Sequence, residues 1–128
     1  MIQQVTKGIR ISVETRYEGS FLKNSTPNHA FRYLITIENQ SKDVVQLTRR
    51  HWKIMESSRP IQIVNGPGVV GKKPIMKSGQ IVQYESGCIL NSPTGAMKGS
   101  YTMINHSTAN EFEVKIPVFQ LDTPFSLN

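Results

Sequence analysis

The sequence predicts an all-β protein: an antiparallel β-sandwich of about seven or more strands with almost no helix. Three observations support this prediction. Apolar residues alternate with polar ones over several short segments, which is the period of a half-buried strand. Turn-forming residues separate these segments at regular spacing, as in sandwiches. No window shows a sustained 3.6-residue apolar period, so helix content should be close to zero.

The first two predicted strands cover residues 9–17 and 31–38, where apolar side chains occupy every second position. Between them, residues 18–29 are polar and include a glycine and a proline, which predicts a loop. Residues 39–43 carry turn-forming side chains and predict a hairpin connection to the next strand.

The third predicted strand, residues 44–55, changes phase along its length. Its apolar side chains fall at odd positions near Val45 and at even positions near Trp52. A regular strand cannot place both on one face, so we expect a β-bulge within residues 48–51. A strand covered on both faces is the alternative, but it fits poorly with Arg49 and its basic neighbour in the middle.

The rest of the chain predicts further short strands. Proline at position 117 should stop the last of them or place it at a sheet edge, because proline cannot donate to the ladder. These strands are residues 61–64, 80–85, 99–104 and 111–116, with a short extended piece at 118–121.

Length and composition predict one domain over residues 1–128 in a reducing compartment. Cys88 is the only cysteine, which excludes an intramolecular disulfide framework. No apolar run is long enough to span a membrane, and the first residues lack a secretory signal. We therefore expect a cytoplasmic protein without membrane insertion.

Positive charge is concentrated in the middle of the chain. The formal net charge is +6, and Glu85 is the only acidic residue between positions 57 and 110. This surplus favours anions, although lysines also serve solubility. No pattern of aromatic and arginine residues accompanies the lysines, so the sequence disfavours nucleic acid as a partner.

A glycine-rich segment, residues 64–74, contains a G-x-G-x-x-G pattern. A dinucleotide fingerprint needs a helix that starts at its glycines, and Pro74 leaves no room for one. Two interpretations stay open. The glycines could permit turns between strands, with the Asn65-Gly66 pair as a hairpin signal. Alternatively, a loop that binds an anion could be formed by Gly66, Gly68, Gly71, Lys72 and Lys73.

The sequence gives no positive sign of catalysis, metal binding or a cofactor. His29, His51 and His106 lack metal-ligand spacing, and Cys88 has no cysteine partner. Hard cations need clustered carboxylates, which the central segment lacks. No nucleophile elbow is present. We predict no catalytic residues, no metal ligands and no cofactor.

Five motifs in order carry a resemblance that runs from about residue 9 to residue 124. They are Arg50-His51-Trp52, the segment GPGVVGKKP at 66–74, Ser86-Gly87-Cys88 with Leu90, the segment GAMKGSY at 95–101, and Ile116-Pro117-Val118-Phe119. With these motifs the chain resembles the ApaG family.

The resemblance implies a β-sandwich of the immunoglobulin or fibronectin type III kind. It also implies a link to cobalt and magnesium homeostasis in bacteria, whereas related eukaryotic domains act as protein-interaction modules. In many relatives the glycine loop includes an acidic residue, whereas this chain has Pro67 and Lys72-Lys73. That difference argues against a direct metal-binding role for the loop.

Together these observations predict a non-enzymatic interaction module with an unknown protein partner. The basic cluster of Arg49, Arg50, His51 and Trp52 is the predicted contact surface. The alternative is a binder of phosphate, pyrophosphate or a nucleotide at the glycine loop. Open sheet edges also favour a homodimer.

Overall fold

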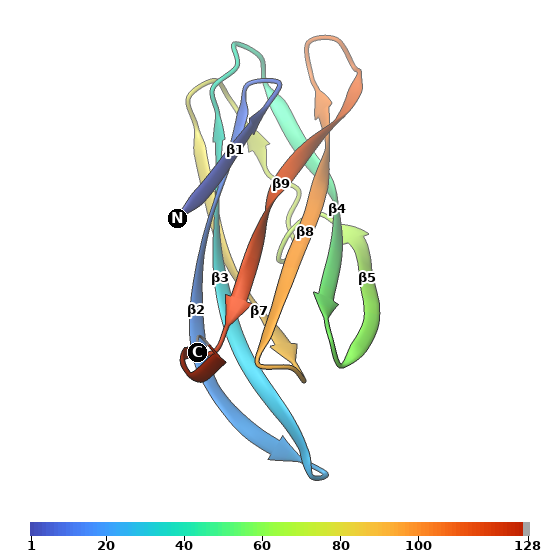
Figure 1. Cartoon of the computed structure of the whole chain (residues 1–128). Coiled ribbons are helices and arrows are strands. Elements are labelled where there is room, and N and C mark those ends of the chain that lie inside the picture. Colours follow the sequence, from blue (N-terminus) through green and yellow to red (C-terminus); the bar gives the residue numbers. More distant parts are fainter. Residues whose placement is uncertain (127–128) are drawn as a thin grey trace.

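The computed structural model describes residues 1–126 as two antiparallel sheets packed face to face (Figure 1). The first sheet has the strand order β1-β2-β3-β7, and the second has the order β5-β4-β8-β9, with β6 also paired to β4. The strands are β1 Ile2–Thr6, β2 Ile9–Lys23, β3 Thr26–Asn39, β4 Val45–Glu56, β5 Arg59–Pro67, β6 Ile75–Met76, β7 Ile81–Leu90, β8 Thr94–Asn105 and β9 Glu111–Asp122. The predicted all-β sandwich is confirmed.

Helix is confined, within the described residues, to the single 3-10 turn η1, Pro124–Ser126. No helix in this part of the chain is long and apolar enough to cross a membrane.

The core lies between the sheets and follows the predicted alternation. Ile9, Ile11 and Val13 of β2 are buried, as are Ile35 and Ile37 of β3. An aromatic cluster ties the two layers together, because Tyr33 of the first sheet packs on two rings of the second. The ring centroids of Tyr33 and Trp52 are 5.4 Å apart, those of Tyr33 and Phe119 are 5.7 Å apart, and those of Trp52 and Phe119 are 5.9 Å apart.

The predicted bulge in β4 is confirmed at Thr48. Leu47 pairs with Met103 and Arg49 with Thr102, so Thr48 has no counterpart in the β8 ladder. The extra residue reverses the alternation, and both Leu47 and Trp52 therefore point into the core.

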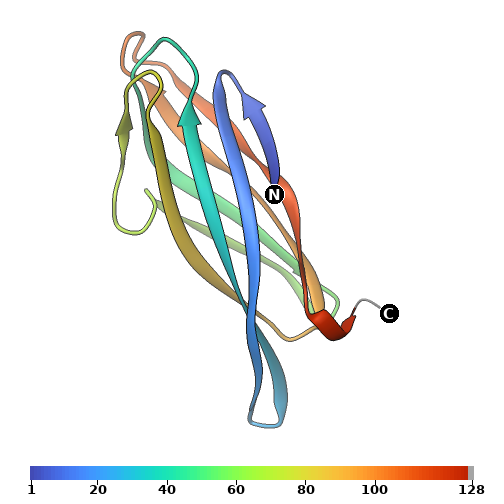
Figure 2. The same cartoon turned by 90° about the vertical axis from the view of Figure 1, so that its left-hand side faces the viewer.

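The predicted loop at residues 18–29 is wrong. β2 continues to Lys23 and β3 begins at Thr26, which makes one long hairpin that extends beyond the rest of the sandwich (Figure 2). Its tip is a two-residue turn in which Asn24 and Ser25 have φ values of 51° and 63°, as hairpin turns require. Because this arm projects past the core, much of it lies in water, and it lacks the apolar alternation that identifies a strand in the sequence.

The predicted hairpin at residues 39–43 is also wrong, because this segment crosses from the first sheet to the second. Buried Asn39 organises the crossing. Its Nδ2 donates to the carbonyl oxygens of Asp43 at 2.8 Å and Met76 at 3.0 Å, and its Oδ1 accepts from the Ser41 N–H at 3.0 Å. Side-chain hydrogen bonds thus replace the ladder that a hairpin would have continued.

The two lateral sides of the sandwich differ. On one side β1 lies against β9 (Figures 1 and 2), where the Lys115 N–H donates to Thr6 Oγ1 at 3.3 Å. On the other side the edge strands β5 and β7 do not pair with each other. We call this side, bounded by β5 and β7, the open side.

Candidate functional site

The open side contains a cleft of about 360 Å³ between the two sheets. It brings Arg50 of β4 together with the glycine-rich segment after β5 and with the tyrosines of β3 and β7. The lining residues are Tyr33, Arg50, Trp52, Ile54, Val64, Val69, Val70, Tyr84, Glu85, Ser86, Gly87 and Met97.

Arg50 is the only cationic residue among those that line the cleft. The bulge at Thr48 turns its side chain inward, because Arg50 shares the phase of buried Trp52. Its Nη1 donates to the carbonyl oxygens of Pro67 at 2.8 Å and Gly68 at 3.1 Å. Two backbone carbonyls thereby fix the guanidinium at the mouth of the cleft.

Gly66 makes this position of Arg50 possible. A Cβ at position 66 would lie 2.8 Å from Arg50 Nη2 and 2.9 Å from Arg50 Cζ. The predicted hairpin turn at Asn65-Gly66 is wrong, because β5 continues through both residues to Pro67 and pairs with β4. Gly66 therefore provides room for a side chain and does not form a turn.

The turn of the glycine-rich segment lies further along, between Val69 and Lys72. The Val69 N–H donates to the Lys72 carbonyl at 2.8 Å, and the Lys72 N–H donates back at 2.9 Å. Val70 and Gly71 between them have φ values of 48° and 74°, so both central residues adopt the left-handed region of a tight hairpin turn. Gly68, with φ 58°, has a Cβ position only 2.1 Å from the Lys72 carbonyl oxygen, so no side chain fits there.

These hydrogen bonds bear on the predicted anion loop. The N–H groups of Gly68, Val69 and Lys72 already donate to Thr48, Lys72 and Val69 respectively. Lys72 and Lys73 are exposed and do not line the cleft. The structure thus brings Arg50, rather than the two lysines, together with the glycines.

Two tyrosines, Tyr33 and Tyr84, line the cleft, and Tyr84 is bonded to the buried Tyr101. The hydroxyls of Tyr84 and Tyr101 share a short hydrogen bond. Burial raises the pKa of Tyr33, Tyr84 and Tyr101, although the charge of Arg50 acts in the opposite direction. None of the three can act as a base near neutral pH.

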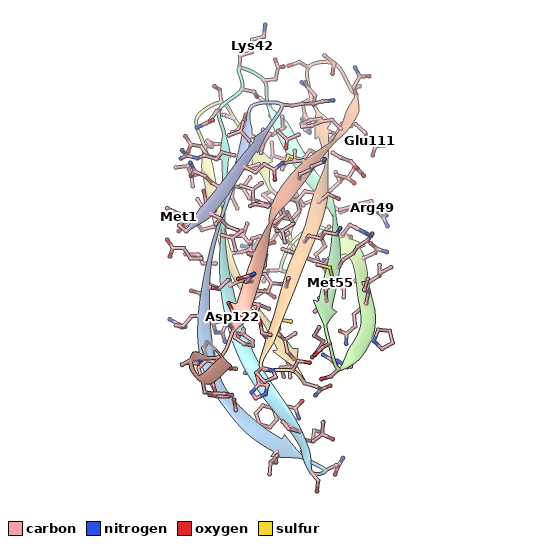
Figure 3. The ribbon with its side chains drawn as sticks, viewed as in Figure 1. Met1, Lys42, Arg49, Met55, Glu111 and Asp122 are labelled. Atoms are coloured by element: carbon pink, nitrogen blue, oxygen red, sulfur yellow. The ribbon has the colours of Figure 1, made fainter. Side chains whose placement is uncertain are left out.

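The predicted contact surface at Arg49 to Trp52 divides between two faces. Trp52 is only 3% exposed and belongs to the core, so its assignment to a contact surface is corrected. Successive residues of a strand point to opposite faces, and Arg50 accordingly enters the cleft. Arg49 is exposed on the outer face of the second sheet, where Figure 3 shows its side chain pointing away from the sandwich. His51 points the same way, with Nδ1 bonded to Asn65 Oδ1.

An ion pair between buried Glu56 and half-exposed Arg59 lies at the end of the open side, and the sequence interpretation missed it. The Glu56 side chain is 2% exposed, and its Oε1 accepts from the N–H groups of Asn91 and Ser92, each at 2.7 Å. Arg59 Nε donates to Oε2 at 2.6 Å. Burial alone would raise the pKa of Glu56, but these hydrogen bonds outweigh it and hold the pKa below its ordinary value. The only signal in the sequence was a Glu and an Arg on either side of a Ser-Ser turn.

The histidines and Cys88 do not assemble a reactive centre. Within residues 1–126 no group of three or more His, Cys, Asp or Glu side chains could hold a metal ion. Cys88 is buried, and burial raises the pKa of its thiol to about 11, so the thiolate is scarce near neutral pH. His29 is buried with Nδ1 2.6 Å from Ser20 Oγ. His106, which follows β8, is hydrogen-bonded through Nε2 to Oε1 of Gln46 in β4 at 3.0 Å.

The edge strand β5 presents apolar side chains beside the cleft. Ile61 is 60% exposed and Ile63 is 59% exposed, and both lie on the outer face of the second sheet. Val64 points to the other face and lines the cleft. The strand is thus unpaired along one edge and apolar on its surface.

The family model and the related sequences that match this chain both belong to ApaG proteins. The family described as "ApaG domain" matches residues 20–105. A protein named "Protein ApaG" from Beijerinckia indica is 41% identical over 126 residues, which cover 98% of this chain and 96% of the relative. Another of the same name from Rhodospirillum centenum is 39% identical over 124 residues, with 97% and 95% covered.

Solved structures show the same similarity in three dimensions. The X-ray structure of the Northeast Structural Genomics Consortium target SoR45 superposes with a TM-score of 0.86 at 35% identity, over 91% of this chain and 88% of that one. The crystal structure described as the putative ApaA protein from Bordetella pertussis gives 0.83 at 34% identity, over 91% and 94%. None of these names states an enzymatic activity.

Proposed function

Because the chain belongs to the ApaG family, we propose that it is a non-enzymatic module that binds a protein partner at the open side of the sandwich. In this proposal residues 1–128 act as one domain in the cytoplasm. The partner is an extended segment that adds a strand to β5.

The observation that carries the proposal is the unprotected edge of β5. Proteins commonly blunt such edges with lysines, bulges or prolines, because free N–H and C=O groups pair readily with other chains. In β5 the only charged residue is Arg59, at the first position, and the prolines lie at positions 60 and 67. The stretch between them exposes Ile61 and Ile63 and carries no charge.

The adjoining cleft supports the same proposal. A strand added to β5 lies next to the opening between the sheets, where Val64 and Val70 are exposed and Arg50 is fixed by backbone carbonyls. Backbone hydrogen bonds would provide affinity, and a side chain that enters the cleft would provide selectivity. Arg50 would favour a polar or acidic side chain at that position.

Capture of partners from bacterial extract tests the proposal when wild type and edge variants are compared. Lysines at an edge are a natural means of preventing strand addition, so the double variant Ile61→Lys/Ile63→Lys should lose the captured protein. Leu22→Lys is the matched control, because Leu22 is 73% exposed at the tip of the β2-β3 hairpin. Equal capture by the edge variant and wild type would contradict the proposal.

The same edge can pair with a second copy, which is the basis of the homodimer we propose. Two β5 strands paired antiparallel would join the second sheets of two molecules. Sedimentation velocity should then give a dimer for wild type and a monomer for Ile63→Lys. A wild-type monomer at micromolar concentration would exclude this arrangement.

A phosphate-containing small molecule is the second candidate, and the geometry of Arg50 favours it. Arg50 Nη1 donates to the carbonyl oxygens of Pro67 and Gly68, whereas Arg50 Nε and Nη2 donate to no protein acceptor in the described residues. Pyrophosphate or ATP at about 100 times its dissociation constant would stabilise the protein by about 2.7 kcal/mol, a clear shift in a melting curve. Arg50→Gln should abolish that shift, and a shift retained in the variant would remove Arg50 from the site.

The link to cobalt and magnesium homeostasis is proposed as an indirect effect through the partner. Direct binding would need a cluster of ligands, and the described residues offer none with three His, Cys, Asp or Glu side chains. Melting curves with Co²⁺ or Mg²⁺ should therefore match the metal-free curve. A metal-dependent shift removed by a single substitution would replace the indirect role with a direct one.

A further inference from the structure

The outer face of the second sheet carries a group of basic side chains that the cleft does not use. We call Arg49, His51, Lys53, Lys98 and Lys115 the basic band. They come from three neighbouring strands, β4, β8 and β9, and their side chains point away from the core. The band therefore lies on the surface of a sheet rather than in a loop.

The strand register brings these residues close together. Lys53 of β4 is directly opposite Lys98 of β8. Ser100 of β8 is opposite both His51 of β4 and Lys115 of β9, which places those two in one row across the sheet. A shallow hollow of about 380 Å³ on this face is lined by His51, Lys53, Lys98 and Lys115, and Glu113 is the one acidic residue among its described lining residues.

The lysines and the arginine of the band, which are Arg49, Lys53, Lys98 and Lys115, are not in ion pairs within the part of the chain that the structure describes. Like charges directly opposite in a sheet are destabilising, so the pair of Lys53 and Lys98 costs the free protein stability. A ligand with carboxylates would relieve that repulsion and gain the attraction of both lysines.

Apolar side chains border the band and indicate the class of ligand. Ile63 is in register with Lys53, and Val118, which is 57% exposed, lines the same hollow. A phosphate backbone gains nothing from such neighbours, whereas a protein segment buries them. Trp52, Tyr101 and Phe119 are all buried, so no aromatic ring of these positions offers a stacking surface for bases.

We propose that the basic band binds an acidic protein segment whose carboxylates alternate with apolar side chains. This inference rests on the proposed function, that the chain binds a protein, and deepens it by naming the chemistry of the partner. Carboxylates would lie over Lys53, Lys98 and Lys115, and apolar side chains would pack on Ile63 and Val118. Ile63 belongs to both this surface and the free edge of β5, so the lysines of the band, rather than Ile63, are substituted to test the band separately.

Fluorescence polarisation with the full chain tests this proposal. The probe is a short fluorescein-labelled peptide of alternating Glu and Leu, compared with the same peptide carrying Lys for Glu and with a single-stranded oligothymidine. The band variant is Lys53→Gln/Lys98→Gln. The matched control, Lys42→Gln/Lys77→Gln, removes the same charge from two loops outside the band.

We expect the acidic peptide to bind wild type and the control alike, and the band variant about fivefold more weakly, because two surface charge pairs are lost. The band variant should melt no lower than wild type, since it also loses a like-charge pair, so weaker binding cannot be attributed to misfolding. Higher salt should reduce the binding.

Three results would overturn the proposal: no binding of the acidic peptide, an equal loss in both variants, or tighter binding of oligothymidine with the same dependence on the band. The last result would assign the band to nucleic acid. Extract capture separates this proposal from the proposed function. A partner still captured by the band variant but lost with Ile61→Lys/Ile63→Lys would refute only the band.

Discussion

The outer faces of the two sheets each place two positive side chains directly opposite each other, but they differ in whether an acidic side chain neutralises the pair. On the first sheet Arg16 is directly opposite Arg32, and Glu18 accepts from both, at 3.1 Å and 3.0 Å. On the second sheet Lys53 is directly opposite Lys98, and neither has an acidic partner in the described residues. Two like-charge pairs thus have the same geometry, but only one is neutralised internally.

Two further ion pairs lie on the first face, although exposed Glu14 is in none of them. Arg10 pairs with Glu38 directly across the strands, and Arg32 also approaches Glu85 at 3.8 Å. The hydrogen bond from Arg16, assisted by Arg32, lowers the pKa of Glu18. A face whose charges are paired has little to gain from a charged ligand, whereas an unpaired one gains from an opposite charge. The difference points to the second sheet as the binding side.

The largest expected effect concerns the core that supports both faces. Trp52→Ala removes the ring that packs on Tyr33 of the first sheet and Phe119 of the second. The expected loss of unfolding free energy is about 3–5 kcal/mol, as for other buried aromatic truncations. Urea denaturation measures it. A loss of less than about 1 kcal/mol would show that the sheets do not depend on this contact.

Glu56→Gln should have the next largest effect, because it removes a buried carboxylate that holds Arg59 and two backbone N–H groups. We expect a loss of about 1–3 kcal/mol at neutral pH. The folded pKa of Glu56 is depressed, so its stabilisation is present above the unfolded value and disappears as pH falls through the folded value. Melting temperatures below pH 4.5 should therefore converge for variant and wild type. A constant difference at all pH values would contradict this linkage.

Glu18→Gln would make the first face more like the second. Without this carboxylate, Arg16 and Arg32 face each other as Lys53 and Lys98 do, and only Glu85, 3.8 Å from Arg32, is left to compensate. The site is exposed, so the expected drop in melting temperature is smaller than for Glu56→Gln and shrinks as salt is added. Thermal melts at low and high ionic strength measure it. An unchanged melt at low salt would show that Glu18 does not compensate the arginine pair.

Lys98→Glu makes the opposite change on the second face and should have the smallest effect. It replaces a like-charge pair with an opposite-charge pair, so we expect a gain of about 0.2–1 kcal/mol at low salt. Chemical denaturation at low ionic strength can detect it, with Lys42→Glu as the control outside the face. Destabilisation by Lys98→Glu would mean that the two lysines do not repel each other in the free protein.

The fold could be predicted wherever the chain faces the core. Alternation identified β2, β3 and β4, and the change of phase between Val45 and Trp52 located the bulge that turns Arg50 inward. The hairpin arm was missed because its strands extend past the core and keep no apolar stripe. The crossing at Asn39 was missed because side-chain hydrogen bonds, rather than turn residues, define it.

The candidate site was less accessible to prediction, because it depends on register between distant strands. The segment from Arg49 to Trp52 is continuous in sequence, but strand geometry sends its side chains to two faces and buries the tryptophan. The glycines suggested an anion loop, whereas Gly66 gives room to Arg50. The pairing of Lys53 with Lys98 is visible only once β4 and β8 are aligned.

Hydrogen exchange with a captured partner tests the central claim, that the second sheet and its free edge form the binding side, most directly. Amide exchange of the full chain would be compared with and without the partner at saturation. The account predicts slower exchange in β5, Arg59–Pro67, and no change in the β2-β3 hairpin. Protection confined to the first sheet, with β5 unchanged, would contradict it.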